Sequence, residues 1–96
     1  MEREQIREKL KSQKPFLRQR YHVKKMGIFG SVARNEANKK SDIDVLVEFN
    51  EPIGMFEFIR LEYFLKKILK RKVDLVTKKA LKRAIKKDIL KETIYV

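Results

Sequence analysis

The sequence contains no cysteine, no tryptophan and one histidine, and it has only three glycines and two prolines in 96 residues. Without cysteine, the fold has no disulfide, no thiolate zinc site and no cysteine nucleophile. No apolar run approaches the roughly twenty residues that a membrane-spanning helix needs. The N-terminal segment Met1–Gln5 is charged and lacks the apolar core of a signal peptide. We therefore expect a cytoplasmic protein with no membrane partner.

The chain is short and strongly basic, with a net charge of +12. Its length allows a single domain over residues 1–96, with a core large enough for a small sheet and a few helices. Residues 1–25 carry nine basic and three acidic side chains, and residues 78–96 carry seven and two, whereas residues 26–77 are nearly balanced with nine and eight. Two interpretations of the basic ends stay open: they attract an acidic ligand or partner, or they are ordinary solvated faces.

Apolar periodicity predicts helices and strands along the whole chain, and this order indicates an α/β (α+β) fold in which helices flank a small sheet. Helices are expected at residues 2–12, 16–20, 31–36, 55–69 and 81–90. Strands are expected at residues 25–29, 42–49 and 72–76. The apolar face of the longest helix is broad enough for a partner protein to cover part of it. Its aromatic side chains are expected mainly in the core: Phe56, Phe58, Tyr63 and Phe64.

Asp42 and Asp44 stand two residues apart at the start of the second strand. Because strand side chains alternate in direction, both carboxylates point to one face while Ile43 and Val45 point into the core. Two like charges side by side raise a carboxylate pKa and cost stability, and a divalent cation with oxygen ligands relieves both penalties. The pair therefore predicts a divalent metal site.

Gly30 and Ser31 end the first strand at the point where a helical turn begins. Glycine lets the backbone approach a ligand closely, and the N–H groups at a helix start, with the Ser31 hydroxyl beside them, are anion donors. We therefore expect a phosphate here. Arg34, one turn later, either reaches that phosphate or covers the surface. Asp74 adds a third carboxylate if its strand pairs beside the first two, and is otherwise an exposed residue of an edge strand.

Ten residues separate Ser31 from Asp42. Gly-Ser, ten residues, then Asp-any-Asp is the signature of the polymerase β-like nucleotidyltransferase superfamily. The chain resembles the small stand-alone branch of that superfamily, the minimal nucleotidyltransferases, over nearly its whole length. Residues 52–58, 72–77 and 92–96 also resemble segments that recur in this branch. The resemblance implies a polymerase β-like core on a small mixed β-sheet, with Mg²⁺ (two ions) as cofactor and ATP as substrate.

The resemblance also implies a role for each residue of the motif. Asp42 and Asp44 are expected to be catalytic and to bridge the two Mg²⁺ ions. Asp74 is expected to hold the ion next to the attacking hydroxyl and to help remove its proton. The Gly-Ser turn is expected to hold the β- and γ-phosphates of ATP, with Arg34 as a further nucleotide-binding residue.

Members of this branch are typically encoded beside a HEPN-type toxin ribonuclease and act as its antitoxin, in a type VII-like toxin–antitoxin pair. The implied activity is that of a protein adenylyltransferase, which moves AMP from ATP to a tyrosine hydroxyl of the toxin. Two alternatives stay open: a nucleotidyltransferase that acts on an RNA end or a small molecule, and a non-catalytic antitoxin that inhibits by contact. Nucleic acid is not the expected substrate, because the basic ends carry no recognised binding motif.

Overall fold

Four strands form one mixed sheet in the computed structural model, which describes residues 3–38 and 41–96. The strand order is β3–β2–β1–β4; β1 pairs antiparallel with both β2 and β4, and β2 pairs parallel with β3. This sheet confirms the expected α/β class. Strand β2 is therefore flanked on both sides. The strands are β1 (Val23–Phe29), β2 (Ile43–Phe49), β3 (Val73–Thr77) and β4 (Ile94–Tyr95).

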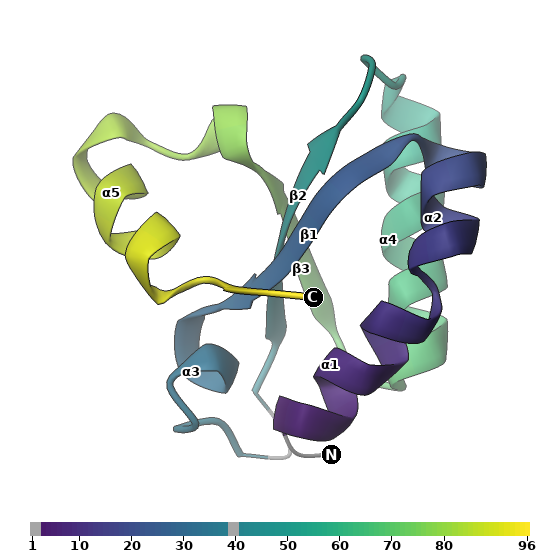
Figure 1. Ribbon diagram of the computed structural model, residues 1–96. Helices are drawn as coiled ribbons and strands as arrows, with labels where there is room; N and C mark the ends of the chain where they lie inside the picture. Colours follow the sequence, from purple (N-terminus) through teal and green to yellow (C-terminus); the bar gives the residue numbers. More distant parts are fainter. Residues whose placement is uncertain (1–2, 39–40) are drawn as a thin grey trace.

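Helices α1, α2 and α4 cover one face of the sheet, and α5 lies on the other side (Figure 1). The helices are α1 (Arg3–Ser12), α2 (Lys14–Tyr21), α3 (Gly30–Ala33), α4 (Met55–Leu69) and α5 (Arg83–Glu92). The core lies between the sheet and the first group of helices, whose fully buried side chains are Ile6, Leu10, Leu17, Leu61, Leu65 and Leu69. None of the ten residues of α5 is fully buried. Among the described residues, no helix is both long and apolar enough to cross a membrane.

Strand β2 alternates between core and opposite face, as its sequence predicts. Ile43, Val45 and Val47 are fully buried and belong to the main hydrophobic cluster. Of the intervening residues, Asp44 and Glu48 are half-buried, whereas Leu46 is buried but lies outside that cluster. Apolar burial on one side of the strand thus leaves the Asp44 carboxylate on the face that α1, α2 and α4 do not cover.

Several helix boundaries differ from the sequence predictions for local reasons. Helix α2 begins at Lys14, because Pro15 lies in its first turn, where the missing proline N–H breaks no helical hydrogen bond. Helix α3 ends at Ala33 instead of residue 36. Helix α5 begins two residues later than expected, after a 3₁₀ turn (Lys78–Ala80) capped by the Thr77 side chain, which accepts from the Ala80 N–H. The two-residue strand β4 was not predicted.

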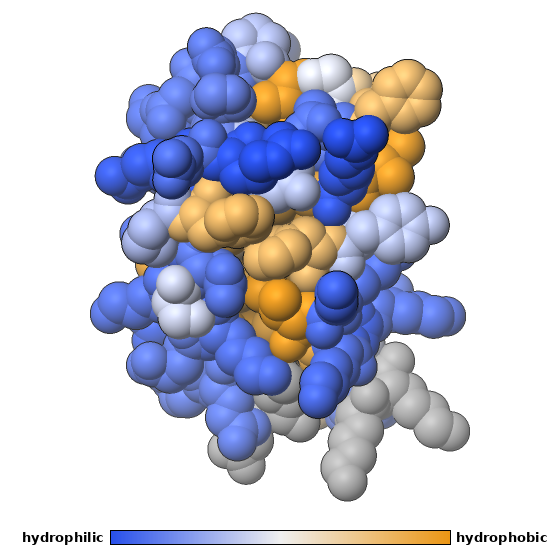
Figure 2. Space-filling view, turned by 90° about the vertical axis from the view of Figure 1, so that its right-hand side faces the viewer, coloured by the Kyte–Doolittle hydropathy of each residue, from blue (hydrophilic) through white to orange (hydrophobic). Residues whose placement is uncertain are grey.

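Phe56 and Tyr63, two aromatic residues of α4 expected in the core, face solvent instead. Phe56 is 78% exposed and Tyr63 is 67% exposed. The buried side of α4 is formed by leucines four residues apart, which a helix places on one face. Figure 2 shows exposed apolar side chains in a band across this side of the molecule. Large exposed apolar residues of α2 and α4 are Phe16, Met55, Phe56, Ile59 and Tyr63.

Candidate functional site

Asp44 and Asp74 are register partners on the parallel strands β2 and β3. Paired positions of neighbouring strands project to the same face, so the two residues stand side by side. Asp44 is half-buried and Asp74 is exposed. Asp42 is exposed and lies one residue before β2. The parallel pairing thus brings the third predicted carboxylate, Asp74, beside Asp44.

The pKa of Asp44 is raised to about 6. Burial is the largest cause, because it disfavours the charged form of a carboxylate. The negative charges of Asp74 and Asp42 act in the same direction, as does Glu92, while the positive charge of Arg34 opposes them. A cation beside Asp44 would relieve this repulsion.

Gly30 makes the turn from β1 into α3 with a φ of +72°. This left-handed conformation strains any residue with a side chain. A Cβ at Gly30 would also overlap the carboxylate of Asp44. The preceding residue, Phe29, is the register partner of Asp44. Glycine is thus required at this position both by the backbone conformation and by the close approach of the turn to β2.

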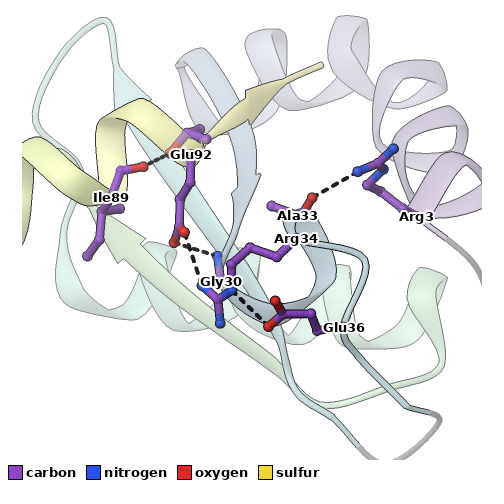
Figure 3. Close-up of polar contacts among 8 residues, drawn as sticks. Arg3, Gly30, Ala33, Arg34, Glu36, Ile89 and Glu92 are labelled. Atoms are coloured by element: carbon purple, nitrogen blue, oxygen red, sulfur yellow. Dashed lines mark hydrogen bonds and ion pairs between the residues drawn. The ribbon is translucent and has the colours of Figure 1, made fainter.

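Ser31 and Arg34 lie within one helical turn of Gly30. Ser31 is half-buried, and Arg34 is exposed directly after α3. The Arg34 Nε donates to the Glu36 carboxylate at 3.1 Å, and its Nη1 donates to Glu92 at 3.0 Å. The guanidinium therefore lies beside the Gly30 turn, where two glutamates take its hydrogen bonds (Figure 3).

Glu92 lies at this site, although its sequence context assigns it no role. Its Oε1 accepts a hydrogen bond from the Gly30 N–H at 3.0 Å, and its Oε2 accepts from Arg34 Nη1 at 3.0 Å. Figure 3 shows Glu92 reaching from the end of α5 to the turn. The two partners of the backbone contact are 62 positions apart in sequence. The only signal is that Glu92 begins the 92–96 segment, which resembles the minimal nucleotidyltransferases.

The donor chemistry at this edge of the sheet suits Mg²⁺, because carboxylate oxygens are the ligands that hard divalent cations prefer. Within residues 3–38 and 41–96, no three Asp, Glu, His or Cys side chains gather closely enough to form a ready metal cage. For a metal ion to bind between β2 and β3, the aspartate side chains must therefore rotate so that their oxygens point toward the same ion. The assignment of Asp42, Asp44 and Asp74 as metal ligands stays a prediction.

A groove of about 730 Å³ lies at the far ends of β2 and β3, beside the loop of residues 50–54. Its lining includes apolar side chains such as Phe49 and Phe58, and three lysines, two that follow β3 and Lys86 of α5. None of the residues predicted for catalysis, metal binding or phosphate binding lines it. The groove and the carboxylates therefore occupy different ends of the same two strands.

Comparison with known proteins gives concordant matches. A family model described as "Nucleotidyltransferase domain" matches residues 4–96. The protein adenylyltransferase MntA of Thermococcus cleftensis is 44% identical over 93 residues, which cover 97% of this chain and 94% of that relative. A solved structure provisionally described as a minimal nucleotidyltransferase has a TM-score of 0.83 and 33% identity, covering 98% of this chain and 95% of its own.

A more distant structural neighbour comes from a complex of the tri-AMPylated HEPN toxin of Shewanella oneidensis with an MNT antitoxin. Its TM-score is 0.69, its identity is 18%, and the match covers 97% of this chain and 70% of that one. At this identity the likeness shows a shared fold.

Proposed function

This chain belongs to the nucleotidyltransferase domain family, and on that premise we propose that it is a protein adenylyltransferase and the antitoxin of a HEPN-type toxin. The observation that carries the proposal is the pairing of Asp44 with Asp74 directly beside the Gly30 turn. This pairing supports the proposal, because two carboxylates then lie next to the turn that would bind phosphate.

In the proposed reaction, the tyrosine oxygen of the toxin attacks the α-phosphorus of ATP. A new oxygen–phosphorus bond forms while the bond from the α-phosphorus to the α,β-bridging oxygen breaks, and pyrophosphate leaves. The hydroxyl loses its proton as the new bond forms. We assign Asp74 to accept this proton, because its carboxylate is exposed to an incoming acceptor.

The carboxylates have a second task in this proposal, which is to hold metal. Asp42, Asp44 and Asp74 would hold the two Mg²⁺ ions through their carboxylate oxygens, with the exposed Asp74 on the side open to the acceptor. When bound, the two ions supply positive charge that stabilises the attacking and leaving oxygens. Asp44 is half-buried on β2, and β2 is paired with a strand on each side. The backbone position of Asp44 is therefore fixed by the sheet.

The β- and γ-phosphates would lie at the Gly30 turn. The Gly30 N–H, which donates to Glu92 in this structure, and the Ser31 hydroxyl would donate to them, and the Arg34 guanidinium would add a positive charge to one side. These groups come from one short segment after β1, so a phosphate bound to them lies close to Asp44. This arrangement directs the α-phosphorus toward the carboxylates.

A protein acceptor is favoured over an RNA end or a small molecule by the relatives. One relative is named a protein adenylyltransferase, and a structural neighbour comes from a complex of an AMPylated HEPN toxin with an MNT antitoxin. A partner protein would bring its own tyrosine to the exposed Asp74.

The test is intact-mass analysis of the HEPN-type protein encoded beside this chain, after incubation with the chain, ATP and Mg²⁺. We expect a mass increase of one or more AMP units, and fragmentation should locate them on tyrosine. The double variant D42N/D44N should produce no increase. D88N is the matched control, because it removes an exposed aspartate of α5 and should transfer AMP normally.

Other outcomes would contradict parts of the proposal. A stable complex without any mass increase would indicate an antitoxin that inhibits by contact. If the two proteins form no complex and the mass does not increase, but the chain transfers AMP to RNA or to a small molecule, the acceptor is different from the one proposed. Normal transfer by D42N/D44N would overturn the site assignment.

A further inference from the structure

Glu92 uses both of its carboxylate oxygens on the groups proposed to bind phosphate. One oxygen accepts from the Gly30 N–H and the other from the Arg34 guanidinium, each at 3.0 Å. Its side chain is only 27% exposed and lies against the Gly30 turn and Arg34 (Figure 3). A carboxylate and a phosphate present the same kind of anionic oxygen to these donors.

The backbone around Glu92 is held firmly against β1. Glu92 is the last residue of α5, and strand β4 follows after one residue and pairs with Gly27 and Ile28 of β1. The Val96 N–H donates to the Met26 carbonyl at 3.0 Å, which extends this pairing to the last residue. Since β1 leads directly into the Gly30 turn, the strand that positions the turn also positions the Glu92 backbone.

Glu92 and a phosphate cannot both accept a full hydrogen bond from the Gly30 N–H. A backbone amide carries one hydrogen, and a strong hydrogen bond needs it to point at one acceptor. The Arg34 guanidinium also donates to Glu36, at 3.1 Å, through another of its five N–H groups. A phosphate that binds the Gly30 N–H must therefore displace the Glu92 side chain, which can rotate away while its backbone stays paired.

We propose that Glu92 is an internal competitor of the nucleotide's polyphosphate, a positioning residue that holds the Gly30 amide and Arg34 until phosphate oxygens replace it. This inference rests on the proposed function, because it takes the same donors to be the phosphate site. Its consequence is that nucleotide binding frees the Glu92 carboxylate and so removes the tie between the end of α5 and the turn.

The test compares the affinities of four proteins for inorganic triphosphate and for an ATP analogue with a methylene α,β-bridge, by calorimetry with Mg²⁺. E92Q keeps the side-chain length but loses the charge that binds Arg34. E92D keeps the charge but retracts it by one methylene from the Gly30 N–H. E36Q is the matched control, because Glu36 pairs with the same guanidinium without touching the turn.

We expect E92Q and E92D to bind both ligands more tightly than the native chain, on the order of fivefold or more, because one charge-assisted competitor is weakened. E36Q should tighten binding by less. Equal or weaker binding by E92Q would overturn the inference. That result is expected if Glu92 only stabilises the structure of the phosphate site and does not compete with phosphate. Tightening by E92Q and E36Q alike, with E92D unchanged, would also overturn it, since net charge alone would then explain the effect.

The same measurement separates this inference from the proposed function. If the native chain and E92Q bind the analogue equally well and the native chain still transfers AMP, the competitor inference fails and the proposed function stands. If neither the native chain nor any variant binds the analogue or triphosphate, both fail. Thermal unfolding of each variant checks that the fold is intact, and the amide NMR signal of Gly30 reports loss of the Glu92 contact directly.

Discussion

The space that a side chain on Gly30 would need is taken by the carboxylate of Asp44. Gly30 directly follows β1, and Asp44 stands on the neighbouring strand β2, where it is the register partner of Phe29. The proposed phosphate turn and the proposed metal ligand are therefore in contact and form one unit. A shift of the turn toward β2 would push it against the carboxylate, so the position of the turn and the position of the Asp44 side chain are coupled.

The variant G30A should lose both stability and activity. Alanine is strained at a φ of +72°, and its Cβ overlaps Asp44, so we expect the free energy of unfolding to fall by about 2–4 kcal/mol. Chemical unfolding measures this change. G54A is the matched control, because no described atom lies within 4 Å of a Cβ built at Gly54, and it should cost less than about 1 kcal/mol. Equal losses in the two variants would refute the steric argument.

Asp44 should make the metal-free protein less stable as the pH rises. Its pKa is about 6 in the folded chain and about 4 in the unfolded chain, so the folded state binds more protons between these values. By linkage, the free energy of unfolding falls as the pH rises from about 4 to about 6.

In EDTA at pH 7, D44N should therefore be more stable than the native chain by about 1–2 kcal/mol, a figure reduced for the solvent screening of a half-buried group. Urea unfolding at intervals from pH 4 to pH 7 measures both the difference and the slope. D88N should keep the slope of the native chain, because Asp44 is still present. A D44N protein less stable than the native chain at pH 7 would contradict this electrostatic account.

The variant D74N should lose AMP transfer without losing the fold. Asp74 is exposed, and its charge raises the pKa of Asp44, so its removal relieves repulsion and should not lower the melting temperature. We expect the rate of transfer to fall on the order of a hundredfold or more, as for loss of a group that accepts a proton and binds metal. The rate of AMP incorporation measures this. Transfer at the native rate would remove Asp74 from the site.

Gly27 and Thr93 should show energetic coupling, because Thr93, the residue before β4, packs closely against Gly27 of β1. A Cβ at Gly27 would lie 2.5 Å from Thr93 Cγ2, so G27A should cost about 1–3 kcal/mol of unfolding free energy. T93S removes that methyl group but keeps the hydroxyl that donates to the Ile89 carbonyl. G27A/T93S should therefore lose less stability than the sum of the single variants, as measured in a double-mutant cycle. Strict additivity would show that β4 does not meet Gly27 in this way.

Three of the four strands, β1, β2 and β3, could be predicted from local sequence. Alternation along 42–49 predicted that Ile43 and Val45 are buried, and the structure confirms it. The change from strand to turn at Gly30 also follows from local sequence. Both features depend on residues within a few positions of each other, where side-chain period and glycine conformation decide the outcome.

The position of Asp74 needed more than the local pattern. Its strand was predicted from residues 72–76, but the alternation does not say which strand it pairs with. In the structure β3 is an edge strand that pairs parallel with β2, and this pairing sets the exposed Asp74 opposite Asp44. The exposure of Phe56 and Tyr63 had a similar origin, because helical periodicity does not say how wide the covered side of α4 is.

The sequence by itself determined the chemistry of this protein: oxygen ligands without thiols, a Gly-Ser turn at a set distance from paired carboxylates, and an excess of positive charge at both ends. Only the tertiary structure decided that Glu92 meets Gly30 and Arg34. That contact joins residues 62 positions apart, and it exists because β4 pairs with β1 and brings the end of α5 to the turn. Local propensity carries no information about such a pairing, which depends on how the whole sheet closes.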